Sequence, residues 1–175
     1  MPTIDLITAL GRLLSDGSLR DAFAADPLAV AAAFGLREND LATFTRLAPD
    51  DLEFQALVLL RKRFESVRRV IPSTCSRLGG KGWARFQAYA RMHRFSGTDQ
   101  PAREAHGFCQ RLLQLEPEAL CDFEWNRLCF VLGGSRVAAH FVRGLPIRNS
   151  PRLALQCFLR GRRSGCRELA LYFGL

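Results

Sequence analysis

Hydrophobic residues recur every three or four positions through the first hundred residues of the chain, which is the spacing of one face of an α-helix. The pattern predicts helices over residues 4–14 and 27–34, and Gly35 is expected to end the second, because glycine commonly follows the last helical residue. Pro49, followed by two aspartates, predicts the start of a long helix that ends at Pro72.

Further helices are predicted over residues 83–90, 102–115 and 117–132. The last of these is apolar on nearly all of its sides. Such a helix is typically central to a core or covered by a partner.

Beyond Gly133 and Gly134 the hydrophobic period changes from helical spacing to two, which is the pattern of a β-strand. Turn residues separate three alternating segments, residues 136–141, 152–159 and 168–173. They predict a three-stranded antiparallel sheet with one face packed on the helices. Residues 153–159 are also compatible with a helix, because a short apolar run fits both structures.

The expected fold class is therefore α+β and mainly α, with an N-terminal helical bundle followed by a C-terminal antiparallel sheet. The helical region is expected to span residues 1–134 and the sheet residues 135–175, packed together as one unit. At 175 residues, nearly half of them hydrophobic, the chain can bury a real core.

Positive charge accumulates toward the C-terminus. Residues 1–60 carry a net charge of −5, residues 61–134 of +6 and residues 135–175 of +7. Arginine supplies nearly all of it, and its planar guanidinium can bind a carboxylate through two parallel hydrogen bonds. An acidic peptide, a partner protein or a phosphate backbone would each suit this tail, and an ordinary solvated basic surface is the alternative.

No apolar run approaches the ~20 residues of a membrane span, and the N-terminus lacks the pattern of a signal peptide, so a cytoplasmic location is expected. The six cysteines include no Cys-x-x-Cys pair. In a reducing compartment they are expected to serve as small buried hydrophobic residues.

Candidate catalytic and metal-binding groups are sparse. His106 and Cys109 can share a helix face, but the spacing suggests no further ligands for a metal. Asp122 and Glu124 fall on different helix faces, which is poor geometry for acid–base work. The glycine-rich residues 79–82 lack the full phosphate-loop motif. We therefore predict no catalytic residues, metal site or cofactor in this chain.

The predicted sheet indicates peptide binding instead, because an exposed edge can bind an extended peptide through main-chain hydrogen bonds. The last strand is the candidate edge, and a basic turn, residues 160–163, precedes it. The alternative is an edge that is merely short and guarded by charge, as native edges often are.

Four features together resemble a known family: the helical start, the stretch from Arg61 to Pro72, the Trp83-x-x-Phe-x-x-Tyr-Ala segment, and Asp122-Phe123-Glu124-Trp125. The arrangement is similar to the partner subunits of multinuclear non-haem iron oxidative enzymes, which modify ribosomally made peptides. The likeness covers about residues 50–175. It is greater to the thiaglutamate pathway's partner subunit than to that of methanobactin.

The resemblance implies that iron and oxygen chemistry belong to a separate enzyme, with which this chain forms a heterodimer. It also implies that the chain helps to hold the leader of a precursor peptide. In the thiaglutamate case the complex removes the β-carbon of the peptide's C-terminal cysteine.

Two sets of site residues are expected. The leader is expected to contact Arg160, Arg162, Arg163, Arg167, Leu171 and Phe173. The enzyme-facing surface is expected to contain Trp83, Phe123, Trp125 and Arg127, because Trp and Arg often anchor interfaces. A plain core role is the alternative for the aromatic residues.

Two other functions remain open from the sequence. The arginine-rich balance also suits a nucleic-acid-binding protein, although no recognition motif is evident. A small enzyme with a reactive cysteine is the third possibility.

Overall fold

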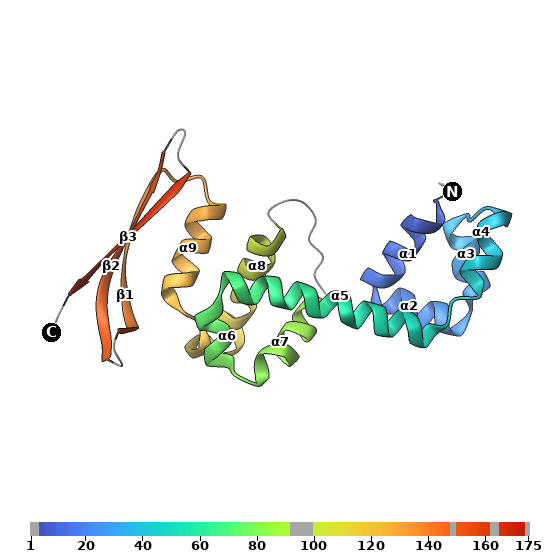
Figure 1. Cartoon of the computed structure of the whole chain (residues 1–175), viewed down its shortest axis with the longest axis horizontal. Coiled ribbons are helices and arrows are strands. Elements are labelled where there is room, and N and C mark those ends of the chain that lie inside the picture. The colour runs from blue at the N-terminus through green and yellow to red at the C-terminus, as the bar shows by residue number, and fades with distance from the viewer. Residues whose placement is uncertain (1–3, 92–99, 148–149, 162–164, 174–175) are drawn as a thin grey trace. The chain divides into compact units, whose positions relative to one another are not determined.

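The computed structural model describes residues 4–91, 100–147, 150–161 and 165–173 (Figure 1). Its helices are α1 (Leu6–Ser15), α2 (Gly17–Ala25), α3 (Pro27–Phe34), α4 (Glu38–Thr45), α5 (Pro49–Val70), α6 (Pro72–Leu78), α7 (Lys81–Ala90), α8 (Gln100–Leu115), the 3-10 helix η1 (Pro117–Ala119) and α9 (Asp122–Leu132). Its strands are β1 (Val137–Ile147), β2 (Ser150–Arg160) and β3 (Cys166–Phe173). The predicted fold class, mainly α with a C-terminal antiparallel sheet, is confirmed.

Local sequence signals account for the first helices. Asp5, Asp16 and Asp26 precede α1, α2 and α3, and each side chain accepts a hydrogen bond from a backbone N–H in the first turn. Such caps satisfy donors that have no partner within the helix. The hydrogen bond from the Thr8 N–H also lowers the pKa of the Asp5 carboxyl. Gly35 ends α3 in the left-handed region, at φ 62°, as the sequence predicted.

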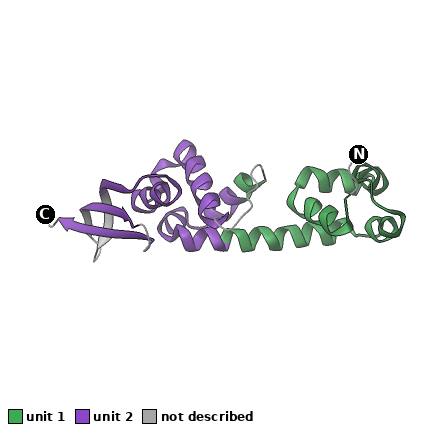
Figure 2. Ribbon diagram, turned by 90° about the horizontal axis from the view of Figure 1, so that it is seen from above, with its two compact units in different colours: residues 1–64, 87–94 green, residues 65–86, 95–175 purple. Residues whose placement is uncertain are grey.

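The chain forms two compact units (Figure 2). Unit 1 comprises residues 1–64 and 87–94, and unit 2 comprises residues 65–86 and 95–175. The change from helix to strand falls between α9 and β1, where the sequence placed it. The units divide within α5 and α7 instead, so that the sheet shares its unit with α6, α8 and α9.

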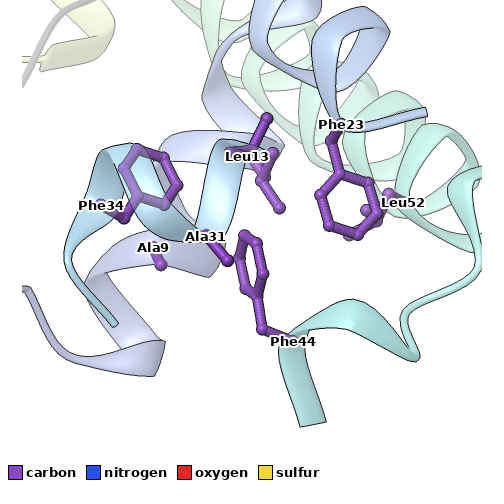
Figure 3. Packing of buried hydrophobic residues seen from close by; sticks show 8 residues of the cluster. Ala9, Leu13, Phe23, Ala31, Phe34, Phe44 and Leu52 are labelled. Atoms are coloured by element: carbon purple, nitrogen blue, oxygen red, sulfur yellow. The ribbon is translucent and has the colours of Figure 1, made fainter. Parts of the chain in front are cut away.

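Unit 1 has a hydrophobic core formed by α1–α4 and the start of α5 (Figure 3). Phe44 lies at its centre, with the rings of Phe23 and Phe34 packed edge-on to it at centroid distances of 5.1 and 6.0 Å. The other buried members are Ala9, Leu13, Val30, Ala31 and Leu52. At the surface, an ion pair of 2.6 Å between Arg20 and Glu53 connects α2 with α5.

Unit 2 contains a second core, in which Phe108 of α8 packs edge-on against Phe86 at 5.5 Å. The predicted continuous helix over residues 117–132 is wrong, because it is divided into η1 and α9 by extended backbone at Leu120 and Cys121. Contacts from α6 explain the break. Arg77 donates to the Leu120 carbonyl, and the Cys121 N–H donates to the Thr74 hydroxyl, so these backbone groups are satisfied outside a helix.

The sheet has the order β1-β2-β3, and both pairings are antiparallel. Val137 pairs with Leu159 across β1 and β2, and Leu155 pairs with Leu171 across β2 and β3. Residues 153–159, which the sequence left open between helix and strand, form the centre of β2. Within the described part of the chain, no helix has the length and apolar character needed to cross a membrane.

Candidate functional site

One face of the sheet, here called the inner face, packs on α9. Ala154 and Phe158 of β2 and Val142 of β1 are buried there. The Phe158 ring stacks on Phe130 of α9 at a centroid distance of 4.9 Å. The other side chains of the inner face include the polar Gln156 and Glu168 and the small Ala170, so polar contacts also hold the sheet in place.

A buried glutamine joins the inner face to α9. Gln156 is completely buried, and its amide nitrogen donates to the Phe123 carbonyl at 3.0 Å and to the Glu168 carboxylate at 2.9 Å. Its amide oxygen accepts from Asn126 at 3.4 Å. A buried amide needs such partners, because an unpaired one costs about 1–3 kcal/mol. The network therefore fixes which residue of β2 lies over α9.

Arg160 also connects the sheet to α9. Its guanidinium donates to the carbonyls of Phe130 and Val131 at 2.6 and 3.0 Å, and it lies over the Phe130 ring at 5.2 Å. A cation at this position satisfies carbonyls left free at the helix end and suits the negative end of its dipole. Because its guanidinium has these internal partners, a contact of Arg160 with a leader peptide stays a prediction.

The opposite face, here called the outer face, is apolar and exposed. The side chains form cross-strand rows, such as Phe141–Leu155–Leu171 and Ala139–Cys157–Leu169. Six large hydrophobic side chains of this face are exposed, with exposed fractions from 43% for Phe173 to 71% for Phe141. The exposed large hydrophobic residues on this face are Val137, Phe141, Leu159, Leu169, Leu171 and Phe173. A contiguous apolar patch of this kind usually marks an interaction surface.

Three of the predicted leader-binding residues lie together on this face. Arg167, Leu171 and Phe173 are exposed and share one side of β3. Among the described strands, β3 has a neighbour on one side only, so part of its backbone is free to accept another strand. Arg162 and Arg163 lie outside the described residues.

Two of the predicted enzyme-facing residues, Trp125 and Arg127, contact other parts of unit 2. Trp83, Phe123, Trp125 and Arg127 are each half-buried. The Trp125 ring stacks on His106 at 4.8 Å, and Arg127 donates to the Val70 carbonyl at the end of α5 at 2.6 Å. These contacts stabilise unit 2, and a role of the four residues in binding an enzyme stays a prediction.

Glu124 has a structural role that sequence reasoning missed. The carboxylate is buried and accepts from the N–H groups of Ser73 and Thr74 at 2.6 and 2.9 Å, and from the Thr74 hydroxyl at 2.7 Å. It caps the start of α6 from α9. Pro72 is a signal in the sequence for a helix start, but nothing local indicates that the cap lies fifty residues away.

Burial favours the neutral forms of three thiols, those of Cys75, Cys109 and Cys129, and of the His106 imidazole. It raises the pKa of the Cys75 thiol to about 11, with a further contribution from the Glu124 charge, and it also raises the pKa of Cys109. The His106 ring nitrogen Nε2 lies 3.9 Å from the Cys129 sulfur. Burial lowers the pKa of His106 and raises that of Cys129. These shifts do not favour a thiolate nucleophile.

Among the residues that the structure describes, no group of three or more histidine, cysteine, aspartate or glutamate side chains is arranged to hold a metal ion. No protein-family model, curated protein or solved structure gives a significant match to this chain. The candidate site is therefore defined by its own geometry: an exposed apolar outer face that continues into the open edge of β3.

Proposed function

We propose that this chain is a non-catalytic accessory subunit of an iron- and oxygen-dependent oxidative enzyme. It forms a cytoplasmic heterodimer with that enzyme and binds the leader of a ribosomally made precursor peptide. It thereby enables oxidative modification of the peptide by excision of the β-carbon of its C-terminal cysteine. The observation that carries the proposal is the apolar outer face beside the open edge of β3.

An exposed apolar sheet face is costly to leave in water, since burial of apolar surface contributes about 25 cal/mol per Å². The inner face is already occupied by α9, so the outer face and the β3 edge are available to a ligand. A bound strand would satisfy free backbone groups and cover apolar side chains at the same time.

The iron is assigned to the partner enzyme. In this chain, burial raises the pKa of Cys75 and Cys109 and lowers the pKa of His106, which favours the neutral form of each group. Neutral thiols suit packing rather than nucleophilic chemistry. The contribution of the chain is then proximity. A leader held on the sheet keeps the reactive end of the peptide near the enzyme at an effective concentration that is commonly millimolar for a short flexible link.

The test is to express the chain with an iron-dependent oxidative enzyme and a short precursor peptide encoded beside it. We expect the enzyme and the chain to co-purify, and mass spectrometry to detect the modified peptide only when both are present. Turnover by the chain alone, or tightly bound stoichiometric iron in it, would contradict the proposal. Binding to duplex DNA that weakens steeply with salt would favour the nucleic-acid alternative.

A double variant tests the face itself. Leu169→Thr with Leu171→Thr removes apolar surface from the outer face, and we expect it to release the precursor peptide without unfolding the chain. The matched control is Ile7→Thr with Leu28→Thr, which changes two apolar residues of unit 1 that are likewise highly exposed. Equal retention of the peptide by both double variants would remove the outer face from the proposal.

A further inference from the structure

We infer that the β3 edge binds an extended peptide with a particular spacing of side chains. The peptide has three apolar residues at alternate positions and an acidic residue at the next alternate position. This inference rests on the proposed function and gives the chemistry of the peptide that the function requires. The peptide is added antiparallel to β3, so its acidic residue comes last.

The side chains of β3 alternate between two different environments. Leu169, Leu171 and Phe173 project from the outer face, whereas Glu168 and Ala170 belong to the inner face. A strand added beside β3 continues the pleat, so that every second side chain of the peptide lies next to the apolar row. The other side chains fall on the inner side, where a polar residue is suited to the neighbourhood of Glu168.

The charge of Arg167 determines which end of the peptide carries the acidic residue. Arg167 is exposed and occupies the outer-face position that follows Leu169, Leu171 and Phe173 toward the start of β3. Residues 135–175 carry a net charge of +7, and their one acidic side chain, Glu168, already accepts a hydrogen bond from Gln156. An acidic side chain opposite Arg167 therefore meets an exposed cation, and no acidic side chain of the described strand Cys166–Phe173 lies on that face.

The same charge disfavours a second copy of the chain at this edge. Two sheets that each carry +7 would be brought together without compensating acids. We take the antiparallel direction because it continues the sheet, in which both pairings are antiparallel. The peptide residue opposite Phe173 is then the first of the pattern, and the residue opposite Arg167 is the last.

Two labelled heptapeptides of identical composition test the spacing on the full chain. The matched peptide is Leu-Thr-Val-Thr-Leu-Thr-Asp, and the shifted peptide is Thr-Leu-Thr-Val-Thr-Leu-Asp. The shifted peptide can place its apolar residues on the outer face only by moving one position, which brings its carboxylate opposite Glu168. Loss of an opposite-charge pair is worth up to about 1 kcal/mol, so we expect about fivefold weaker binding in fluorescence anisotropy.

A charge exchange tests the role of Arg167. Arg167→Glu is expected to lower the affinity for the matched peptide. The same variant should bind a version that ends in Lys instead of Asp as tightly as the natural chain binds the matched peptide. Amide hydrogen exchange should show peptide-dependent protection in β3. Equal affinity for the two heptapeptides, no effect of the exchange, or protection elsewhere than the sheet would overturn the inference, and so would a dimer of the free chain that covers β3.

The inference and the proposed function fail in different ways. If the precursor peptide is retained and modified while the two heptapeptides bind equally, the spacing rule is wrong and the accessory role stands. If the chain retains neither the precursor nor the heptapeptides, and no iron enzyme co-purifies with it, both are wrong.

Discussion

The interior of unit 1 and the interior of unit 2 are stabilised by different kinds of contact. The buried cluster of unit 1 is entirely apolar, with Phe44 between two other aromatic rings. The buried polar and charged residues among those described all belong to unit 2, and they are Thr74, Glu104, Glu124 and Gln156. Unit 1 is a hydrophobic core of the ordinary kind, whereas unit 2 contains several polar connections between its elements.

The difference matters because hydrophobic burial is not directional, whereas a hydrogen bond requires a particular partner. In unit 2, Glu124 determines where α6 begins, and Gln156 determines which residue of β2 lies over α9. These polar contacts let α9 bind the less apolar face of the sheet. The more apolar face is consequently left exposed for a ligand.

The largest effect is expected from the core of unit 1. Phe44→Ala should lower the free energy of unfolding by about 3–5 kcal/mol, since it removes the central ring of the cluster. Circular dichroism during chemical denaturation measures the loss. Phe54→Ala, at an exposed position on α5, is the control and should change stability by less than about 0.5 kcal/mol.

The tryptophans separate the two units in the same experiment. Trp83 and Trp125 both belong to unit 2, so their fluorescence follows that unit alone. We expect Phe44→Ala to shift the fluorescence transition less than the circular dichroism transition. Equal shifts would mean that the two units unfold together. The units would then differ in the contacts of their cores but not in their free energy of unfolding.

The second largest effect is expected at the cap of α6. Glu124→Ala leaves the N–H groups of Ser73 and Thr74 and the buried Thr74 hydroxyl without their acceptor, and it should destabilise unit 2 by about 3 kcal/mol. Tryptophan fluorescence measures this transition directly. Glu118→Ala, an exposed glutamate of η1, is the control. A loss no larger than that of the control would show that the cap contributes little.

A smaller loss is expected for the connection between the sheet and α9. Gln156→Leu retains a side chain of similar size but removes the buried amide that donates to the Phe123 carbonyl and the Glu168 carboxylate and accepts from Asn126, which should cost about 2 kcal/mol. Leu169→Thr on the exposed outer face serves as the control and should be nearly neutral. If Gln156→Leu proves more stable than the natural chain, hydrophobic packing decides which face binds α9.

The sequence predicted the fold class and the approximate positions of the strands, because both depend on local periodicity, although β1 continues to Ile147, beyond the predicted end at residue 141. The start of α5 at Pro49 and the end of α3 at Gly35 were predicted for the same reason. The division of residues 117–132 was not, since Arg77 and Thr74 bind the backbone at the break from another part of the chain. Local propensity carries no information about such contacts.

The candidate site was predictable only in part. Alternation over the predicted strand, residues 168–173, placed Leu171 and Phe173 on one side of an edge strand, and in the structure β3 begins at Cys166 and brings Arg167 to the same side. It could not show that Arg160, only a few residues away, donates to carbonyls at the end of α9. Whether an arginine is free or has an internal partner depends on the tertiary structure, which periodicity does not describe.

The smallest expected effect concerns pH and the stack of His106 on Trp125. Burial lowers the pKa of His106, so the folded chain holds the imidazole neutral while the unfolded chain binds a proton at higher pH. The unfolded state therefore gains protons first as pH falls below about 6.5, and stability should decrease in that direction. His106→Phe keeps an aromatic ring against Trp125 and should reduce this dependence between pH 7 and 5. Fluorescence-detected unfolding at several pH values measures the slope, and an unchanged slope in the variant would assign the dependence to another group.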